Sequence, residues 1–462
     1  MNPSGQDNVL GTANVETLLR QLAIPAITAQ VVNVLYNVVD RMYIGHIPDI
    51  GALALTGVGV CMPIIMLITA FAALVSMGSA PRASVLMGRS DNEEAHYTLG
   101  NSFIMLIIIA LVLTVFFRRF AEPILMAFGA SENTIGYAMD YMRIYTLGTI
   151  FVQFALGLNA FITAQGFAKI SMATVVIGAV INIVLDPIFI FGFHMGVKGA
   201  ALATILSQAV SAIWVLRFLT GKKTILKLQK KYFRLRGSVV GPCLLLGMSP
   251  FIMQATESAI SVCFNSSLYR YGGDIAVGAM SILTSIMQFS MLPLQGFTQG
   301  AQPITGYNFG AGNADRVRQT FRLLLRYCLT YSLILWAICM VVPRLIPSMF
   351  TGDEQLLTYT AWALRHYMAL SGIFGIQIAC QQTFIAIGNA KTSLFLAVYR
   401  KIILLIPLIY ILPAILEQKD RAVFLAEPVA DLIAVATTAI MFAYQFNNAM
   451  KKLEAGKKPA EA

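Results

Sequence analysis

Four polar side chains within apolar stretches of the sequence could bind a proton or a metal ion. Asp40, Asn182, Asp186 and Thr204 all offer oxygen atoms, and Asn182 and Asp186 are four residues apart, which places them on one face of a helix. A carboxylate at the centre of a bilayer costs at least about 2.5–3.5 kcal/mol, so acids there usually serve a function. Oxygen ligands of this kind suit a proton or a hard cation such as Na⁺. A network of hydrogen bonds between helices is the alternative.

The positions of the two acids along their apolar stretches indicate that they lie at a similar depth. Asp40 comes about four residues before the end of its stretch and Asp186 about seven before the end of its own, at about 1.5 Å per helical residue. Two carboxylates in one low-dielectric site cannot both ionise cheaply. The common depth is compatible with a cation-coupling site formed by Asp40 and Asp186 with Asn182 and Thr204, and also with a network of hydrogen bonds between helices.

A second set of polar or flexible residues could contribute to a substrate site or to another polar site, namely Glu257, Asn37, Tyr36 and Met287. Glu257 is near the middle of an apolar stretch. Asn37 is three residues before Asp40 on the same helix face. Met287 shares a face with Met280 and Met291; such a stripe more often packs in a core, although flexible methionines also suit sites that accept varied ligands.

Two further acids, Glu427 and Asp431, are four residues apart in the last apolar stretch. Their spacing leaves pairing with a basic residue and a role in transport as equal alternatives. The histidines and cysteines show no metal-ligand spacing. We accordingly expect neither a bound metal nor a cofactor, and no catalytic residues.

The composition requires that these residues lie in membrane-spanning elements. Of 462 residues, 57% are apolar and only 12% are charged, whereas a soluble protein has about 45–50% apolar and about 25% charged residues. The mean hydropathy is +0.72. A spanning helix needs about 20 apolar residues, so the chain can fill about a dozen spans. This composition excludes a soluble enzyme, a disulfide scaffold and a disordered chain.

Uninterrupted apolar runs predict helices, because strands of a barrel would alternate in polarity. The fold class predicted is an all-α polytopic membrane protein with twelve transmembrane helices. We place these spans at 18–44, 52–80, 97–117, 135–163, 170–193, 197–219, 239–269, 275–304, 319–343, 355–385, 392–416 and 423–446.

The distribution of positive charge predicts the orientation in the membrane. Twelve spans put both termini on one side, and the segments on that side carry about three times as many Lys and Arg residues as the segments on the other. We therefore place both termini in the cytoplasm of a protein of the plasma (inner) membrane. The net charge of +11 reflects juxtamembrane loops, and we expect no nucleic-acid partner.

The sequence contains an internal repeat. Adding 222 to a residue number carries Pro81 to Pro303 and Arg143 to Arg365, and it carries the pattern AxGxAKxS at 164–171 to 386–393. Each repeat holds six spans, so the two are parallel and favour a central cleft that opens alternately to each side. The predicted organisation is a cytoplasmic tail (1–17), an N-terminal bundle (18–219), a basic cytoplasmic linker (220–238), a C-terminal bundle (239–446) and a second tail (447–462).

Several segments resemble the multidrug and toxic compound extrusion (MATE) family, and together they cover nearly all of the chain. They are the segment 39–46 that closes the first span, Pro25, the two AxGxAKxS junctions, Asp186-Pro187 and 199–201. The resemblance implies two six-helix bundles around a V-shaped cleft. It implies efflux of organic, often cationic and amphipathic compounds in exchange for H⁺ or Na⁺. It also implies a cation site at the positions of Asp40, Asn182, Asp186 and Thr204.

An ion gradient is the energy source that we expect, and two other classes of protein remain as alternatives. The chain has no GxxxxGK[ST] loop, which favours an ion gradient over ATP. We expect an antiporter that works as a monomer in the lipid bilayer. A flippase for lipid-linked precursors, of related fold, is the alternative. Its cavity should contain many Arg and Lys residues to hold a pyrophosphate, whereas only Arg400 and Lys401 lie well inside a span of this chain. A polytopic membrane enzyme is a weaker alternative, because no catalytic cluster is present.

Overall fold

The computed structural model describes residues 9–456 of the chain, so residues 1–8 and 457–462 of the two predicted tails lie outside the described part. Every regular element in 9–456 is helical. This is the expected outcome in lipid, where a helix satisfies its own backbone hydrogen bonds.

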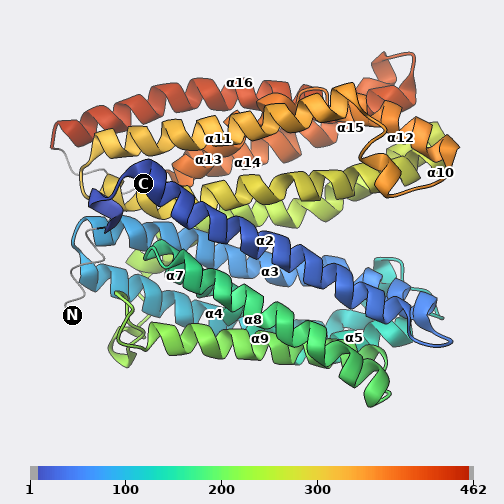
Figure 1. Cartoon of the computed structure of the whole chain (residues 1–462), viewed down its shortest axis with the longest axis horizontal. Helices are drawn as coiled ribbons and strands as arrows, with labels where there is room; N and C mark the ends of the chain where they lie inside the picture. The colour runs from blue at the N-terminus through green and yellow to red at the C-terminus, as the bar shows by residue number, and fades with distance from the viewer. Residues whose placement is uncertain (1–8, 457–462) are drawn as a thin grey trace.

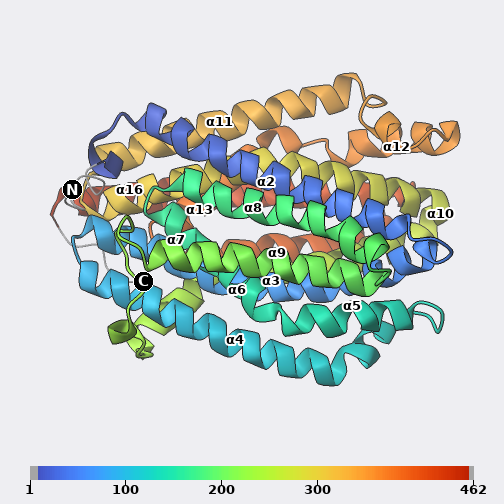
Figure 2. The ribbon, with the colours of Figure 1, turned by 60° about the horizontal axis from the view of Figure 1, so that its bottom comes forward.

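The helices up to the linker form the N-half of the molecule (Figures 1 and 2). Their bounds are α2 (Val15–Gly45), α3 (Gly51–Gly88), α4 (Asn92–Ala127), α5 (Ile135–Leu147), α6 (Thr149–Gly157), α7 (Asn159–Ala164), α8 (Ala168–Pro187), the π-helical η1 (Ile188–Gly192) and α9 (Val197–Leu219).

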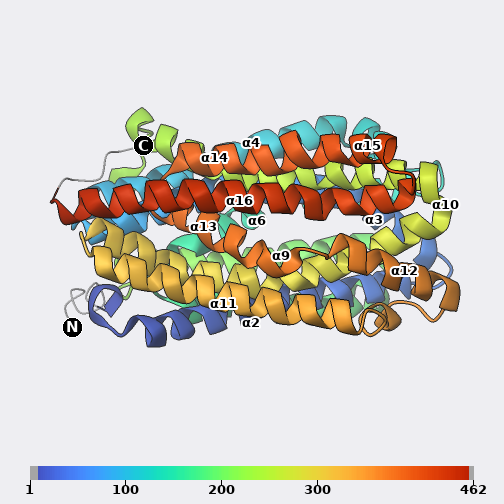
Figure 3. The same ribbon diagram turned by 90° about the horizontal axis from the view of Figure 1, so that it is seen from above.

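The remaining helices form the C-half, in which α16 runs beside α14 and α15 (Figure 3). Their bounds are α10 (Gly237–Gly310), α11 (Ala314–Val341), α12 (Glu354–Tyr367), α13 (Phe374–Ala386), α14 (Ala390–Val398), the π-helical η5 (Tyr399–Leu405), α15 (Ile406–Ile415) and α16 (Lys419–Glu454). Short 3₁₀ turns lie at Lys230–Tyr232, Pro347–Met349 and Ser371–Ile373.

The predicted count of twelve spans is consistent with these helices. Within the described residues, nine helices are long and apolar enough to cross a membrane, or eleven if α5–α7 and α12–α13, bent by 59° and 50°, each form one span. The twelfth span comes from α10, whose 74 residues would extend about 110 Å if straight. Instead α10 reverses at Gly273. The reversal is evident from Gly247 and Gly310, which lie on either side of Gly273 and both contact the C-terminal half of α3.

Most helices extend beyond the predicted spans. α3 continues to Gly88, α4 covers 92–127, and α16 continues to Glu454. Hydropathy marks the part of a helix that lies in lipid, whereas polar residues and capping side chains continue the helix into the headgroup region. Asp91, for example, accepts a hydrogen bond from the backbone N–H of Glu94 and so caps α4.

The two halves meet most closely at the end of the molecule that holds both ends of the described chain (Figure 1). A Cβ atom at Gly78 would lie 1.9 Å from the carbonyl oxygen of Cys243, and one at Gly310 would lie 1.9 Å from that of Val85. Only glycine permits this approach of α3 to α10. Toward the opposite end the two sets of helices diverge (Figure 1).

The basic linker is held firmly to the N-half. The side-chain oxygen of Gln165 accepts hydrogen bonds from the Thr224 hydroxyl and from the backbone N–H groups of Ile225 and Leu226. Asn101 accepts a further one, at 2.7 Å, from the backbone N–H of Arg236. The linker is thus an ordered part of the molecule.

Candidate functional site

The four residues predicted to bind the coupling ion lie on three neighbouring helices of the N-half. Asp40 comes from α2, Asn182 and Asp186 from α8, and Thr204 from α9, and these three helices pack side by side (Figure 2). Asn182 and Asp186 are fully buried, and Asp40 and Thr204 are 7% and 9% exposed. The carboxyl groups of Asp40 and Asp186 lie close enough for the charge of one to affect the other. The Asn182 amide donates a hydrogen bond of 3.2 Å to Oδ1 of Asp186.

Local features of the sequence bring the start of α9, the helix that carries Thr204, against the end of the helix that carries Asp186. Directly after Asp186-Pro187 the helix widens into the π-helical η1. A Cβ atom at Gly199 would lie 2.7 Å from the carbonyl carbon of Phe189, so only glycine lets the start of α9 rest against η1. Thr204 follows one turn later in α9 and is buried there.

This site contains more hydrogen-bond acceptors than donors. Oδ1 of Asp40, Oδ1 of Asn182 and Oδ2 of Asp186 are buried without a hydrogen-bond partner among the described residues. The Thr204 hydroxyl donates to the carbonyl of Ala200 at 3.0 Å, which leaves its lone pairs available. Buried polar atoms are almost always satisfied, so these oxygens call for a proton or for a cation with oxygen ligands.

Tyrosine side chains surround the acids. Tyr36, which was predicted from the sequence, lies within electrostatic range of both Asp40 and Asp186. Tyr141 on α5 lies within range of Asp40 and Thr204, and its ring stacks on that of Tyr145 with centroids 5.9 Å apart. This pair of tyrosines was not predicted. The available signal was their i, i+4 spacing together with the match of Tyr145 to Tyr367 in the repeat.

Asn37 forms no hydrogen bond with either carboxylate among the described residues, and Met287 belongs to the C-half. Asn37 is exposed, and its amide donates to the carbonyl of Asn33 in its own helix at 2.6 Å. Met287 is half-buried and packs against the apolar core of the C-half. Their role in substrate binding stays a prediction.

The C-half contains a buried ionic network instead. Arg400 donates to Asp431 at 2.7 Å and to Glu427 at 2.8 Å, and these three side chains are at most 7% exposed. Lys401 donates to Glu257 at 2.7 Å, and the Glu257 side chain is 54% exposed. Arg400 and Lys401 both lie in the π-helical η5. These two consecutive residues contact two different sets of acids.

Pairing is therefore the observed outcome for Glu427 and Asp431. Their partners were not predicted, although a basic dipeptide inside an apolar span signals that acids must be near. The two halves differ in how their buried acids are paired. The acids of the N-half site form no ion pair with a base of the described chain, whereas the network in the C-half pairs three acids with two bases. Among the described residues, no group of three or more His, Cys, Asp or Glu side chains could hold a metal ion.

Comparisons with known proteins agree with this architecture. The family model MatE matches residues 25–188 and 250–411, that is, once in each half. The multidrug export protein MepA of Staphylococcus haemolyticus (strain JCSC1435) is 26% identical over 426 residues, which cover 90% of this chain and 92% of that protein. A solved structure of a MATE protein in the bent conformation has a TM-score of 0.91 at 22% identity, covering 98% of this chain and 99% of the other. A solved structure of the MATE multidrug transporter DinF-BH is 35% identical with a TM-score of 0.87 and covers 95% of this chain and 98% of the other.

Proposed function

The chain belongs to the MatE family, and from this premise we propose that it exports organic, cationic and amphipathic compounds in exchange for H⁺ or Na⁺. The observation that carries the proposal is the pair of buried carboxylates, Asp40 and Asp186, beside oxygen atoms that have no donor among the described residues. The multidrug export activity named for its relatives supports the substrate class.

The site suggests how binding of an ion is coupled to movement. Repulsion between Asp40 and Asp186 is relieved when a proton is bound, or when a cation is held by them with Asn182 and Thr204. The three helices that supply these residues are then drawn together, whereas the ion-free site favours their separation. A ligand that binds one conformation better shifts the population toward it. In an antiporter, the substrate favours the conformation that the ion disfavours.

The proposed energy source is an ion gradient, which is large enough for efflux. A membrane potential of 100 mV contributes about 2.3 kcal/mol per charge moved, which corresponds to roughly a 50-fold concentration ratio. We further propose that both termini face the cytoplasm, as the positive-inside rule predicts.

The decisive experiment uses the full-length protein in liposomes loaded with a cationic dye. A pH gradient and a Na⁺ gradient are imposed separately, and ATP is supplied to a third sample that has neither gradient. We expect one or both gradients to drive efflux and ATP alone to have no effect. Transport that requires ATP and ignores both gradients would refute the proposal.

The first testable prediction is that Asp40→Asn inserts and folds normally but loses gradient-driven efflux, since it removes a buried charge that the coupling ion must neutralise. Asp186→Asn should behave in the same way. The matched control is Asp140→Asn, because Asp140 is half-buried and lies 3.5 Å from Lys198; there we expect a mild effect. Dye efflux by Asp40→Asn at the wild-type rate, with unchanged ion dependence and equal abundance, would mean that the site is wrongly assigned.

The flippase alternative is disfavoured by the pairing of the intramembrane bases. Arg400 is neutralised by Glu427 and Asp431, and Lys401 by Glu257. Neither base is left to hold a pyrophosphate, which a flippase for lipid-linked precursors would have to bind.

A further inference from the structure

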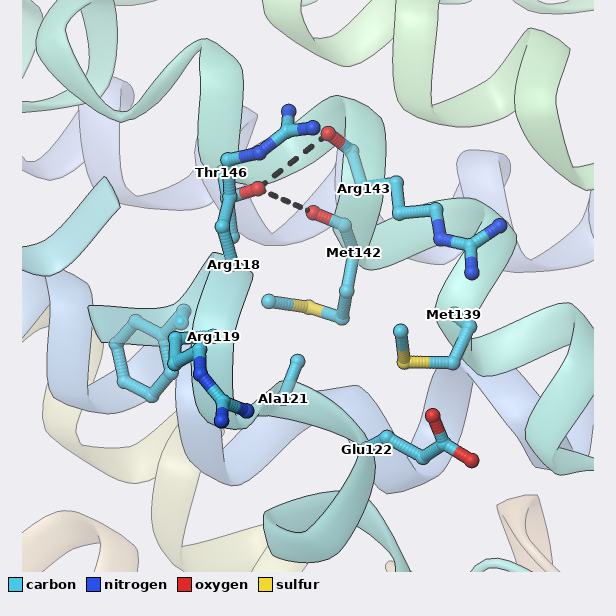
Figure 4. A pocket seen from close by; sticks show the side chains of 9 residues that line it. Arg118, Arg119, Ala121, Glu122, Met139, Met142, Arg143 and Thr146 are labelled. Carbon is cyan, nitrogen blue, oxygen red and sulfur yellow. Dashed lines mark hydrogen bonds between the residues drawn. The ribbon is translucent and has the colours of Figure 1, made fainter. Parts of the chain in front are cut away.

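Residues of α4 and α5 line a cavity of the N-half (Figure 4), and the adjoining ends of these two helices lie away from the termini (Figure 2). Its volume is about 210 Å³. Figure 4 shows four charged side chains around it, those of Arg118, Arg119 and Glu122 on α4 and of Arg143 on α5. Phe117, Met139 and Met142 provide apolar walls.

The positive charges around this cavity are not neutralised within the described chain. No ion pair involves Arg118, Arg119, Arg143 or Glu122 among residues 9–456. Within the same range, the only aromatic contact of these arginines is that of Arg119 with its neighbour Phe120, at 5.4 Å. All four charged residues are exposed. Three guanidinium groups and one carboxylate leave an excess of two positive charges around one cavity.

The cavity lies at the boundary between hydrocarbon and headgroups. Arg118 directly follows the apolar run 103–117, and Val115, one turn earlier in α4, is 68% exposed. On α5, Leu147 is 60% exposed one turn beyond Arg143. Exposed apolar side chains next to arginines mark the depth at which acyl chains give way to phosphates.

The internal repeat shows that the fold does not require this cluster. The equivalent of Arg143 in the C-half is Arg365, whose Nε donates to the carbonyl of Met340 at 3.2 Å. Met340 is the equivalent of Arg118, and Val341 is the equivalent of Arg119. Arg344, the equivalent of Glu122, pairs with Glu354 at 2.7 Å. Both arginines of the C-half therefore have partners in the described chain, whereas the three arginines of the N-half form no ion pair there.

We propose that this cavity binds the phosphodiester of an anionic phospholipid. Guanidinium groups bind phosphate oxygens in pairs of parallel hydrogen bonds, and the methionine and phenylalanine walls suit the glycerol backbone and the first acyl carbons. The double positive excess favours a lipid with a net negative charge over a zwitterionic one. A soluble organic phosphate would offer the same headgroup chemistry but no acyl chains.

The test uses the purified full-length protein in detergent with three probes: phosphatidylglycerol, phosphatidylcholine with the same acyl chains, and soluble glycerol phosphate. Retained lipid is counted by native mass spectrometry, and the thermal unfolding midpoint is followed during titration. We expect phosphatidylglycerol to be retained and to raise the midpoint at lower concentration than the other two probes. The double variant Arg118→Gln/Arg143→Gln should weaken this apparent affinity about tenfold, whereas the matched control Arg365→Gln should leave it unchanged.

Three outcomes would overturn the proposal. They are equal retention of phosphatidylglycerol and phosphatidylcholine, wild-type affinity in the double arginine variant, or saturation by glycerol phosphate at the concentrations at which the lipid acts. If the glutamine variant is unstable, Arg118→Lys/Arg143→Lys provides the same test. It keeps both charges but loses the paired hydrogen bonds, so we expect a smaller but measurable loss.

Discussion

At the scale of single residues, the two halves treat buried charge in opposite ways. Asp40 and Asp186 share a site without an ion-paired base among the described residues, while Arg400 is held between Glu427 and Asp431. An ion pair in a low-dielectric environment stabilises little overall, but removal of one partner leaves the other charge uncompensated. We therefore propose that the acids of the N-half serve coupling and that Arg400 serves the integrity of the C-half.

The second prediction follows from this difference. Arg400→Met leaves Glu427 and Asp431 buried without a base, and we expect it to destabilise the fold by about 3–5 kcal/mol. Protonation of these acids removes the penalty, so the stability deficit should shrink as the pH falls. Lys401→Met is the matched control, because its partner Glu257 is half-exposed and can be hydrated. Thermal unfolding of both variants between pH 5 and pH 8 is the measurement; equal midpoints for the two would contradict the assignment.

The residues of the proposed N-half site are easier to pick out in the sequence than the partners in the C-half network. Asp40, Asn182, Asp186 and Thr204 stand out because polar oxygens interrupt apolar runs. Tyr141 does not stand out, since tyrosine is common in membrane spans and only packing shows that it faces the acids. The partners of Arg400 depend on how far η5 rotates relative to α16, and a π-helical turn changes that rotation without a clear sign in the sequence.

At the scale of elements, α10 depends on one residue to form two spans. Gly273 has φ 65° and ψ −160°, a conformation that is essentially restricted to glycine. It separates two stretches that hydropathy correctly predicts as separate spans, 239–269 and 275–304. The ends of the helices could not be predicted as well, because hydropathy reports burial in lipid and not the continuation of a helix into water.

The third prediction concerns this reversal. Gly273→Ala should destabilise the protein by about 1–3 kcal/mol, because alanine must adopt a strained backbone conformation there. Gly241→Ala is the control on the same helix: it has helical dihedrals and open space around its Cα, so helix propensity should make it neutral or slightly stabilising. The measurement is the thermal unfolding midpoint of both variants. An unchanged midpoint in Gly273→Ala would show that another residue makes the turn.

At the scale of the whole molecule, backbone contacts between α3 and α10 hold the halves together at one end only. The fourth prediction is that Gly310→Val shifts the population toward a conformation that is open at the end of the molecule nearest the chain termini. The reason is steric, because a Cβ atom at this position would lie 1.9 Å from the carbonyl oxygen of Val85. Spin labels on the ends of α3 and α11 nearest the termini should report longer distances. Gly59→Val, in the same helix as Val85 and with nothing within 4 Å of its Cβ, should leave the distances unchanged.

An unchanged distance distribution in Gly310→Val would mean that these contacts do not control opening. The Gly310→Val variant also tests the packing of the halves independently of ion binding, because Gly310 lies in the opposite half from Asp40 and Asp186. A variant that opens at the terminal end but still responds to the coupling ion would assign the two roles to different parts of the molecule.

The ordered linker has a consequence for the covalent continuity of the chain. Gln165 and Asn101 fasten residues 224–236 to the N-half, and the glycine contacts of α3 with α10 join the halves without help from the linker. The exposed pair Lys222-Lys223 precedes the fastened segment. We therefore expect a chain cut by a protease at this pair to keep the contacts between its halves, so that the two fragments elute from a gel-filtration column as one particle.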